Sequence, residues 1–477
     1  MYMPKKTLYT VLAGMGLFFA SWANSTVKVN PDARVDLLSL VFHYAGNQEF
    51  GKFFLPEFEA AADVWFADMH NHPVIAMARE FHQKHGVSYD AISKLAIRLT
   101  PDDLQLLPDS LKSLDPRWPR EQLEEFLTQL RDFSRQSRFP EFYRAQVSTY
   151  QDGCKFWQLM LEKSEIIPWL KQFYGDKRPL HFAVIPSALE NGGVGPSLEI
   201  DGTFYCYMVI CCRSKAENLY RSPHFSQLEK FIESSCLSVL AHEFSHPWTN
   251  PVTLSIYPQI RATAEKFFPA VLEIMKRQAY GKPETMMLET INRAAESVYF
   301  HDRYGAENAK EFLAKQKSNG FLLTERVYHC ILAERQKGGT SWCFADGAQA
   351  YADCINAPES LQILNEFFRA RKNAPSILSF SPRNGAKGVA PSTREIIVTF
   401  NKPMKKSMSI CTGDLKPYPK VESATYNPEQ TVLTLKVQLK PDMEYRLWFN
   451  RGAHTNFAST DGGVLPDTEY VFTTAAE

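Results

Sequence analysis

The sequence feature that most constrains the fold is the run Leu240-Ala241-His242-Glu243-Phe244-Ser245-His246. Two histidines four residues apart lie on the same face of a helix, so both imidazole rings can reach one metal ion. The glutamate after the first histidine is placed to hold a water at that metal and to take its proton. This HExxH pattern is typical of zinc hydrolases, chiefly peptidases. The alternative interpretation is a core helix whose histidines are only hydrogen-bonded.

The residues around the motif predict its local structure. Residues 231–241 are apolar enough to form a buried helix. Because the residue before a proline is pushed out of the α conformation, we expect Pro247 to end that helix. The two histidines should therefore lie at the end of a buried helix, where the chain opens into a loop.

A zinc peptidase uses three protein ligands and leaves a fourth position for water. In the longer metzincin motif a glycine would stand at Thr249 and a histidine at Val252, and neither does. We therefore expect the third ligand to come from further along the chain, such as a carboxylate on the helix predicted over 283–299. Glu289 lies in the middle of that helix. The alternatives that stay open are Glu296, Glu284 and His301.

The motif also predicts a role for each of its residues in hydrolysis. His242 and His246 would bind zinc through neutral imidazoles, and Glu243 would act as general base for a zinc-activated water that attacks a carbonyl. The oxyanion that develops needs a hydrogen-bond donor besides zinc. The sequence offers several candidates for that donor without choosing among them, namely Tyr299, His301, Tyr328 and His329.

The size and charge of the chain limit its possible partners. A chain of 477 residues is too long for one compact core, so two or three domains are expected. Lys plus Arg and Asp plus Glu both number 53, so charge does not indicate nucleic acid or an anionic membrane surface as a partner. We expect a peptide or protein substrate instead.

The N-terminus is typical of a secretory signal peptide. Lys5 and Lys6 precede an apolar run, and Ser21-Trp22-Ala23 supplies small residues at the cleavage-determining positions. The apolar run is well short of the roughly 20 residues that a membrane-spanning helix needs, although an uncleaved anchor is the alternative. We therefore expect residues 1–23 to be removed and the mature chain to be secreted or periplasmic. No later stretch is long and apolar enough to span a membrane.

The pattern of the chain changes twice. Residues 33–172 are predicted to be helical, whereas residues 181–186 and 204–211 are rich in β-branched and aromatic side chains and predict strands. An exposed edge strand just before the HExxH helix can pair with an extended substrate backbone. Helices follow again up to about residue 371. Beyond Ala374-Pro375, about 100 residues of short alternating strands predict a β-sandwich.

Nine cysteines are present, so at least one has no partner within the chain. None shows the CxxC spacing of a structural zinc site. Disulfides among Cys330, Cys343 and Cys354 are possible, and the sequence does not fix their connectivity.

The residues also resemble a known family. The segments Arg34-Val35-Asp36-Leu37-Leu38, His242-Glu243-Phe244-Ser245-His246 and Glu289-Thr290-Ile291-Asn292-Arg293-Ala294 are similar to those of secreted bacterial proteins grouped as a domain of unknown function. The resemblance covers roughly residues 33–370. It implies a gluzincin-like zinc peptidase fold and supports Glu289 as the third ligand. Thermolysin-like gluzincins carry an aspartate four residues after that glutamate, where this chain has Arg293.

The tail, with Phe380-Ser381-Pro382 and the closing Phe472-Thr473-Thr474, resembles bacterial Ig-like domains appended to secreted proteins. Together these observations predict an α+β protein. A largely helical zincin-like metallopeptidase region over residues 30–372, helical to about residue 175 and then carrying a small sheet, precedes an all-β Ig-like sandwich over residues 375–477.

The function predicted from the sequence is a secreted zinc-dependent peptidase. Its metal would be Zn²⁺, bound by His242, His246 and Glu289, with Glu243 as the catalytic base. The alternative is a non-catalytic protein that uses a peptidase-like fold for cell-surface or polymer binding. An intact Glu243 disfavours that alternative, because a decayed site would lose this glutamate early.

Overall fold

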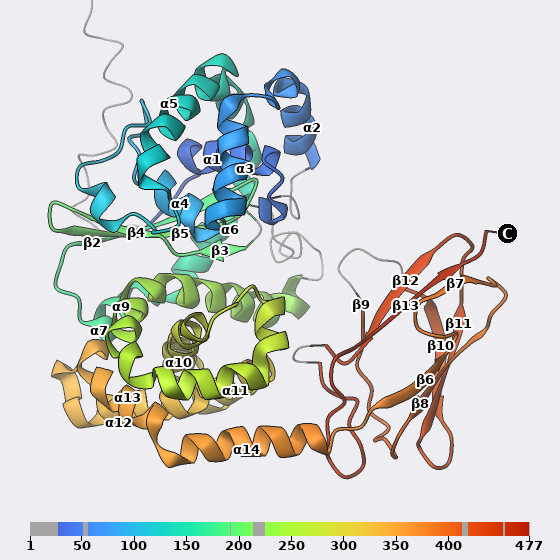
Figure 1. Ribbon diagram of the computed structural model, residues 1–477. Coiled ribbons are helices and arrows are strands. Elements are labelled where there is room, and N and C mark those ends of the chain that lie inside the picture. The colour runs from blue at the N-terminus through green and yellow to red at the C-terminus, as the bar shows by residue number, and fades with distance from the viewer. Residues whose placement is uncertain are drawn as a thin grey trace, which may run out of the picture. The chain divides into compact units, whose positions relative to one another are not determined.

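A computed structural model describes residues 27–50, 56–190, 192–212, 225–412, 418–451 and 454–476, with only the backbone at 56 and 225–235 (Figure 1). The expected signal peptide, residues 1–23, lies outside the described residues. The chain divides into two compact units, residues 1–251 with 343–345 and residues 252–342 with 346–477. The predicted α+β class, a largely helical region with small sheets followed by a strand-rich C-terminal region, is confirmed.

The first unit begins with a layer of helices. They are α1 (Ala33–Tyr44), α2 (Pro56–Trp65), α3 (Pro73–His85), α4 (Asp90–Ala96), α5 (Arg120–Gln136) and α6 (Phe139–Ser164). Helix α7 (Ile166–Tyr174) is separate from this layer, since its Tyr174 stacks on Trp248. Helix α1 is buried on every side, because all of residues 35–42 in it are buried. A helix with no solvent face is the centre of a core rather than its cover. Helices α3, α4 and α6 pack directly against α1, and α2 and α5 pack on these helices in turn.

A five-stranded sheet lies against this layer (Figure 1). Its strands are β1 (Lys28–Val29), β2 (Leu180–Ser187), β3 (Gly193–Val194), β4 (Ser197–Ile200) and β5 (Thr203–Cys211). The order is β1-β2-β5-β3, with β4 also paired to β5; β1, β2 and β5 are parallel, whereas β3 and β4 run antiparallel to β5. Ile185 and Val209 join the core formed with the helices. Phe182 and Phe204 point to the opposite face, as their ring contacts with Phe244 and Trp248 show.

The HExxH motif lies inside one long helix, α9 (Phe225–Arg277), of 53 residues. The prediction that Pro247 ends this helix is wrong, because α9 continues to Arg277. A proline inside a helix removes one hydrogen bond and costs about 3 kcal/mol. Fully buried Phe244 packs on the sheet through Phe182 at 5.4 Å, and Trp248 stacks on Tyr174 at 4.7 Å. Full burial of Phe244 contributes roughly 1.5–3 kcal/mol, and the contacts of partly buried Trp248 add to this, so together they offset the proline.

The second unit continues with helices and ends in a sandwich. Its later helices are α10 (Pro283–Tyr304), α11 (Ala306–Ser318), α12 (Thr324–Gly338), α13 (Ala348–Asn356) and α14 (Pro358–Lys372). The helix predicted over 283–299 is α10, which begins at Pro283 and continues to Tyr304, and the last helix ends at Lys372, close to the predicted end near residue 371. Residues 344–347 form a 3₁₀ turn before α13.

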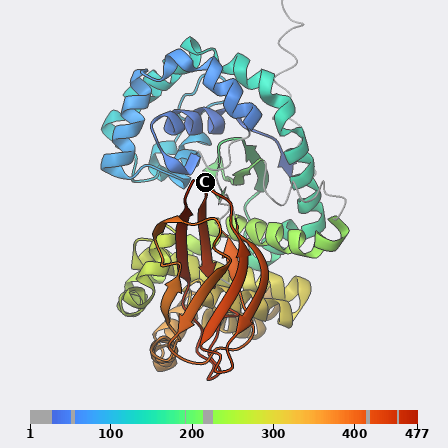
Figure 2. The same ribbon diagram turned by 90° about the vertical axis from the view of Figure 1, so that its right-hand side faces the viewer.

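The C-terminal strands form two four-stranded sheets, β10-β11-β8-β6 and β7-β13-β12-β9. Figure 2 turns this region toward the viewer. The strands are β6 (Ile377–Ser381), β7 (Ala386–Val389), β8 (Glu395–Phe400), β9 (Ile410–Thr412), β10 (Lys420–Tyr426), β11 (Val432–Gln438), β12 (Glu444–Phe449) and β13 (Thr468–Thr474). Inward side chains of both sheets share one core that includes Val398, Leu435, Leu447 and Phe472. This arrangement is a β-sandwich.

Candidate metal centre

The two motif histidines converge in the middle of α9. Nε2 of His242 and Nε2 of His246 lie 3.2 Å apart, and the two rings are nearly perpendicular at 87°. Two nitrogens bound to one tetrahedral zinc at about 2.0–2.1 Å would be separated by about 3.3–3.4 Å. The pair therefore already has the spacing of two ligands on one metal ion.

Asn250 sets the orientation of the second histidine. Its Oδ1 lies 3.2 Å from Nδ1 of His246, one helical turn away. A proton on Nδ1 donated to this oxygen leaves the lone pair of Nε2 free, which is how the partners of metal-ligating histidines usually act. Sequence reasoning assigned no role to Asn250, although its position four residues after His246 is a usable signal.

Glu289 lies on α10 and is 7% exposed. Its Oε2 accepts a hydrogen bond of 3.2 Å from Nη2 of Arg293. Arg293 also donates to Gln316 and to the hydroxyl of Tyr280. Burial lowers the pKa of Arg293, but the Glu289 carboxylate and the neighbouring groups more than compensate, so the pKa is raised overall. A charged guanidinium thus lies beside the Glu289 carboxylate and fixes its orientation.

The structure brings the three predicted ligands together. One ligand atom each from His242, His246 and Glu289 lies within 4.8 Å of the other two. Within the described part of the chain, no other group of three or more His, Cys, Asp or Glu side chains has metal-ligand spacing. Two imidazoles and one carboxylate are a donor set that zinc accepts, and it leaves a fourth position for water. The residues present therefore fit Zn²⁺.

Glu243 faces the edge of the sheet in its own unit. The carboxylate side chain is only 8% exposed. A Cβ atom added to Gly193 in β3 would lie 3.1 Å from both Cγ and Oε1 of Glu243. The predicted base therefore lies directly beside the backbone of an edge strand.

The backbone carbonyl of Glu243 also lies close to the chain that follows β3. Pro247 has no N–H to donate to the Glu243 carbonyl, which is the carbonyl four residues before it. Gly195 occupies the space beside that oxygen, since a Cβ atom there would lie 2.1 Å from it. Any larger residue at position 195 would need the connection between β3 and β4, or the helix, to move.

The other predicted site residues lie outside the three-ligand group. Glu296 is buried on α10, whereas Glu284 in the first turn is partly exposed. His301 contacts the hydroxyl of Tyr328 through Nδ1 at 2.5 Å. Tyr299 is buried, and His329 is exposed and lines a separate pocket. The group thus contains Glu289 rather than the alternatives.

Two buried carboxyl groups near the sheet were not anticipated from the sequence. Burial raises the pKa of Asp36 on α1 to about 7, although hydrogen bonds from Ser187 at 2.6 Å and from Tyr150 act against the shift. Burial also raises the pKa of Glu190 to about 8, aided by the negative charges of Asp36 and Glu49. Oε2 of Glu190 has no hydrogen-bond partner among the described residues. Near pH 7, Asp36 is therefore about half protonated and Glu190 is largely protonated.

Comparison with solved structures gives weak matches to S-layer proteins. The S-layer protein rSbsC(31-844) is 15% identical with a TM-score of 0.17, and the match covers 47% of this chain and 33% of that one. The N-terminal part of the bacterial S-layer protein SbsC is 13% identical with a TM-score of 0.17, and the match covers 55% and 67%. The chain thus spans about a third of the first structure, and scores this low carry no inference about fold or function.

No curated protein matches the chain. Among the helices in the described ranges, none combines the length and hydropathy that a membrane span needs.

Two family models match the chain. Residues 371–474 match the bacterial Ig-like domain, so the β-sandwich belongs to that class. Residues 29–332, more than half of the chain, match the domain of unknown function DUF4932, and the protein therefore belongs to the DUF4932 family.

Proposed function

We propose that this protein is a secreted zinc-dependent peptidase. The observation that carries the proposal is the convergence of His242, His246 and Glu289, whose ligand atoms lie within 4.8 Å of one another. A glutamate that directly follows the first histidine completes the set that metal-assisted hydrolysis requires. A bound Zn²⁺ supplies a polarised water of lowered pKa and a positive charge for the developing oxyanion.

The protein's own residues supply the remaining chemistry. Glu243 accepts a proton from the attacking water and later delivers it to the leaving amine, which is general base and then general acid catalysis. Asn250 holds His246 with Nε2 toward the metal. Arg293 neutralises part of the negative charge on Glu289 and fixes its orientation.

The edge of the sheet favours a peptide as the substrate. β3 is the terminal strand of the order β1-β2-β5-β3, and within the described residues its outer side pairs with no strand. An extended peptide can add to such an edge through main-chain hydrogen bonds. Because Gly193 in β3 lies beside the Glu243 side chain, a peptide bound there would pass close to the base.

The proposal is tested on the purified full-length protein by metal analysis and by hydrolysis of casein, an unstructured protein substrate. We expect about one zinc per chain and casein cleavage that a chelator abolishes and added zinc restores. Glu243→Gln should keep the zinc and lose cleavage by a factor of at least about 100, the lower end of general acid–base contributions. A zinc-free wild type, or a Glu243→Gln protein of near wild-type rate, would refute the proposal.

The third ligand is tested separately by a pair of variants on α10. We expect Glu289→Ala to lose zinc, because two histidines alone bind it weakly. Glu296→Ala, a buried glutamate on the same helix, serves as the matched control and should keep zinc at wild-type stoichiometry. If Glu296→Ala loses zinc and Glu289→Ala keeps it, the ligand assignment is wrong even where cleavage depends on zinc.

A further inference from the structure

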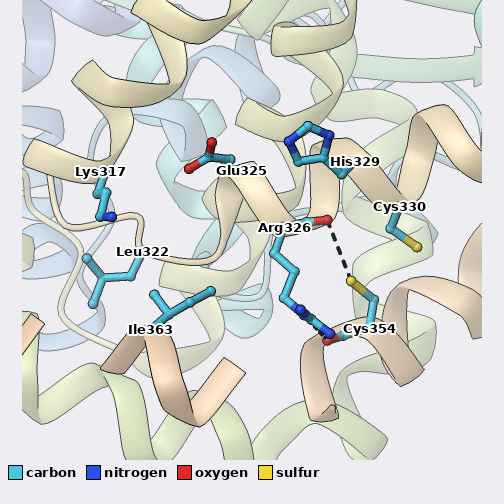
Figure 3. A pocket seen from close by; sticks show the side chains of 8 residues that line it. All are labelled: Lys317, Leu322, Glu325, Arg326, His329, Cys330, Cys354 and Ile363. Atoms are coloured by element: carbon cyan, nitrogen blue, oxygen red, sulfur yellow. Dashed lines mark hydrogen bonds between the residues drawn. The ribbon is translucent and has the colours of Figure 1, made fainter. Parts of the chain in front are cut away.

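A pocket in the C-terminal half of the helical region is lined by two free cysteines. Its volume is about 430 Å³, and its lining includes Cys330, Cys354, Arg326 and His329 (Figure 3). Cys330 lies on α12 and Cys354 on α13, and both thiols are free and half-buried. The pocket contains none of the three metal-site residues, so its chemistry is independent of the proposed zinc site.

The two cysteines reach across to each other's helix. Sγ of Cys330 contacts the carbonyl oxygen of Ala350 at 3.4 Å, and Ala350 lies four residues before Cys354. Sγ of Cys354 contacts the carbonyl oxygen of Arg326 at 3.6 Å, and Arg326 lies four residues before Cys330. Because the contacts are reciprocal, each side chain points at the other's helical turn. Figure 3 shows the two sulfur atoms on the same side of the pocket.

The two thiols have unequal pKa values. Interaction with the Cys330 thiol lowers the pKa of Cys354, and the charge of Arg326 acts in the same direction, against the effect of burial. Interaction with the Cys354 thiol raises the pKa of Cys330, with burial as the next cause. Cys354 is therefore the better thiolate, which is the species that attacks disulfides.

Arg326 holds this arrangement in place. Its Nε donates to the carbonyl oxygen of Cys354 at 2.8 Å, and its Nη2 lies 3.1 Å from Oε2 of Glu359 on α14. The guanidinium thus ties α12 to α13 and α14 beside the thiol pair. A disulfide reagent that enters the pocket can therefore reach two thiols that the folded helices hold next to each other.

We propose that Cys330 and Cys354 form a redox-active pair that is converted to a disulfide by low-molecular-weight disulfides such as oxidised glutathione. The Cys354 thiolate attacks one sulfur of oxidised glutathione, forms a mixed disulfide and releases one glutathione thiolate. Cys330 then loses its proton and attacks the Cys354 sulfur, which releases the second glutathione. Two electrons pass from the pair to the oxidant, and the products are one protein disulfide and two glutathione molecules. The new bond joins α12 to α13.

The experiment uses the reduced full-length protein equilibrated with mixtures of reduced and oxidised glutathione. Free thiols are blocked with iodoacetamide, and the digested protein is analysed by mass spectrometry with and without reduction. We expect one cross-linked peptide pair that contains Cys330 and Cys354, together with loss of both alkylated forms. Half-buried Cys411 in the β-sandwich is the internal control and should stay alkylated under the same conditions.

Single variants test the order of attack. Cys330→Ser should trap the glutathione mixed disulfide at Cys354, where the charge of Arg326 still lowers the thiol pKa. Cys354→Ser should leave less glutathione bound to Cys330 under the same conditions. Cys411→Ser should form the 330–354 cross-link as wild type does. The proposal is overturned if Cys330 and Cys354 both stay alkylated while Cys411 is oxidised, or if either one pairs with a different cysteine. Neither outcome depends on zinc or on peptidase activity.

Discussion

Replacing the buried carboxyl of Glu190 should change how the stability of the protein depends on pH. Glu190 is 4% exposed, and burial raises its pKa from 4.5 to about 8. The folded state therefore binds a proton that the unfolded state has already released at neutral pH. Stability from this group is fully present below pH 4.5 and is lost as the pH rises toward 8, since the unfolded chain binds fewer protons over that window. Glu190→Gln removes the titration.

The size of the effect follows from the two pKa values. Between pH 5 and pH 9, a carboxyl whose pKa is 4.5 unfolded and 8 folded loses about 4 kcal/mol of stabilisation. The free energy of unfolding of Glu190→Gln minus that of wild type should therefore be about 4 kcal/mol higher at pH 9 than at pH 5, which means that the variant gains relative stability as the pH rises. Any constant cost of the substitution cancels in this comparison.

The measurement is urea unfolding of the full-length protein, followed by far-UV circular dichroism at pH 5, 7 and 9 with a chelator present throughout. Glu121→Gln is the matched control, because Glu121 is exposed and loses no solvation on folding. Its free energy of unfolding relative to wild type should vary by less than about 1 kcal/mol across the same range. A Glu190→Gln difference that is the same at pH 5 and pH 9 would refute the argument from burial.

Three further predictions concern the metal centre and the tail. Asn250→Ala should lower zinc affinity about 10- to 100-fold in a chelator competition assay, whereas unchanged affinity would rule out Asn250 as the group that orients its histidine. Gly195→Ala should reduce the free energy of unfolding by about 1–3 kcal/mol in urea, because its Cβ would lie 2.1 Å from the Glu243 carbonyl oxygen. Gly192→Ala, with open space around it, should leave stability unchanged, and equal effects of the two would contradict this reasoning. A fragment of residues 371–477 should unfold cooperatively on heating with the same midpoint with or without a chelator, and a non-cooperative melt would count against an independent sandwich.

The parts of the site that follow from helical periodicity could be predicted from the sequence. The spacing of His242 and His246 places them on one face of any α-helix, and Glu289 lies on a helix that the pattern over 283–299 predicts. The boundary of the β-sandwich near Ala374 could also be predicted, because a strand-rich pattern replaces a helical one there. These features depend on residues close together in the sequence, and tertiary packing does not change them.

What could not be predicted depends on tertiary packing. A local rule about prolines suggests that Pro247 ends the helix, but burial of Phe244 against the sheet overrides it. The roles of Gly195 and Glu190 depend on contacts with distant segments, and neither residue belongs to a recognisable motif. Asp36 lies in a run that resembles an ordinary amphipathic helix, and only the surrounding helices and sheet make it a buried acid.

The position of Asp36 has a consequence for how the chain folds as it is synthesised. Its carboxyl oxygens accept hydrogen bonds from Tyr150 and Ser187, which lie 114 and 151 residues further along the chain. At a synthesis rate of about 5–20 residues per second, Ser187 emerges roughly 8–30 s after Asp36. Until then the core around α1 is incomplete, and the carboxyl of Asp36 lacks its hydrogen bond from the Ser187 hydroxyl of β2. A chain that stopped before residue 180 would thus bury a carboxyl without its Ser187 partner, so the N-terminal helices and the sheet must fold together, late in translation.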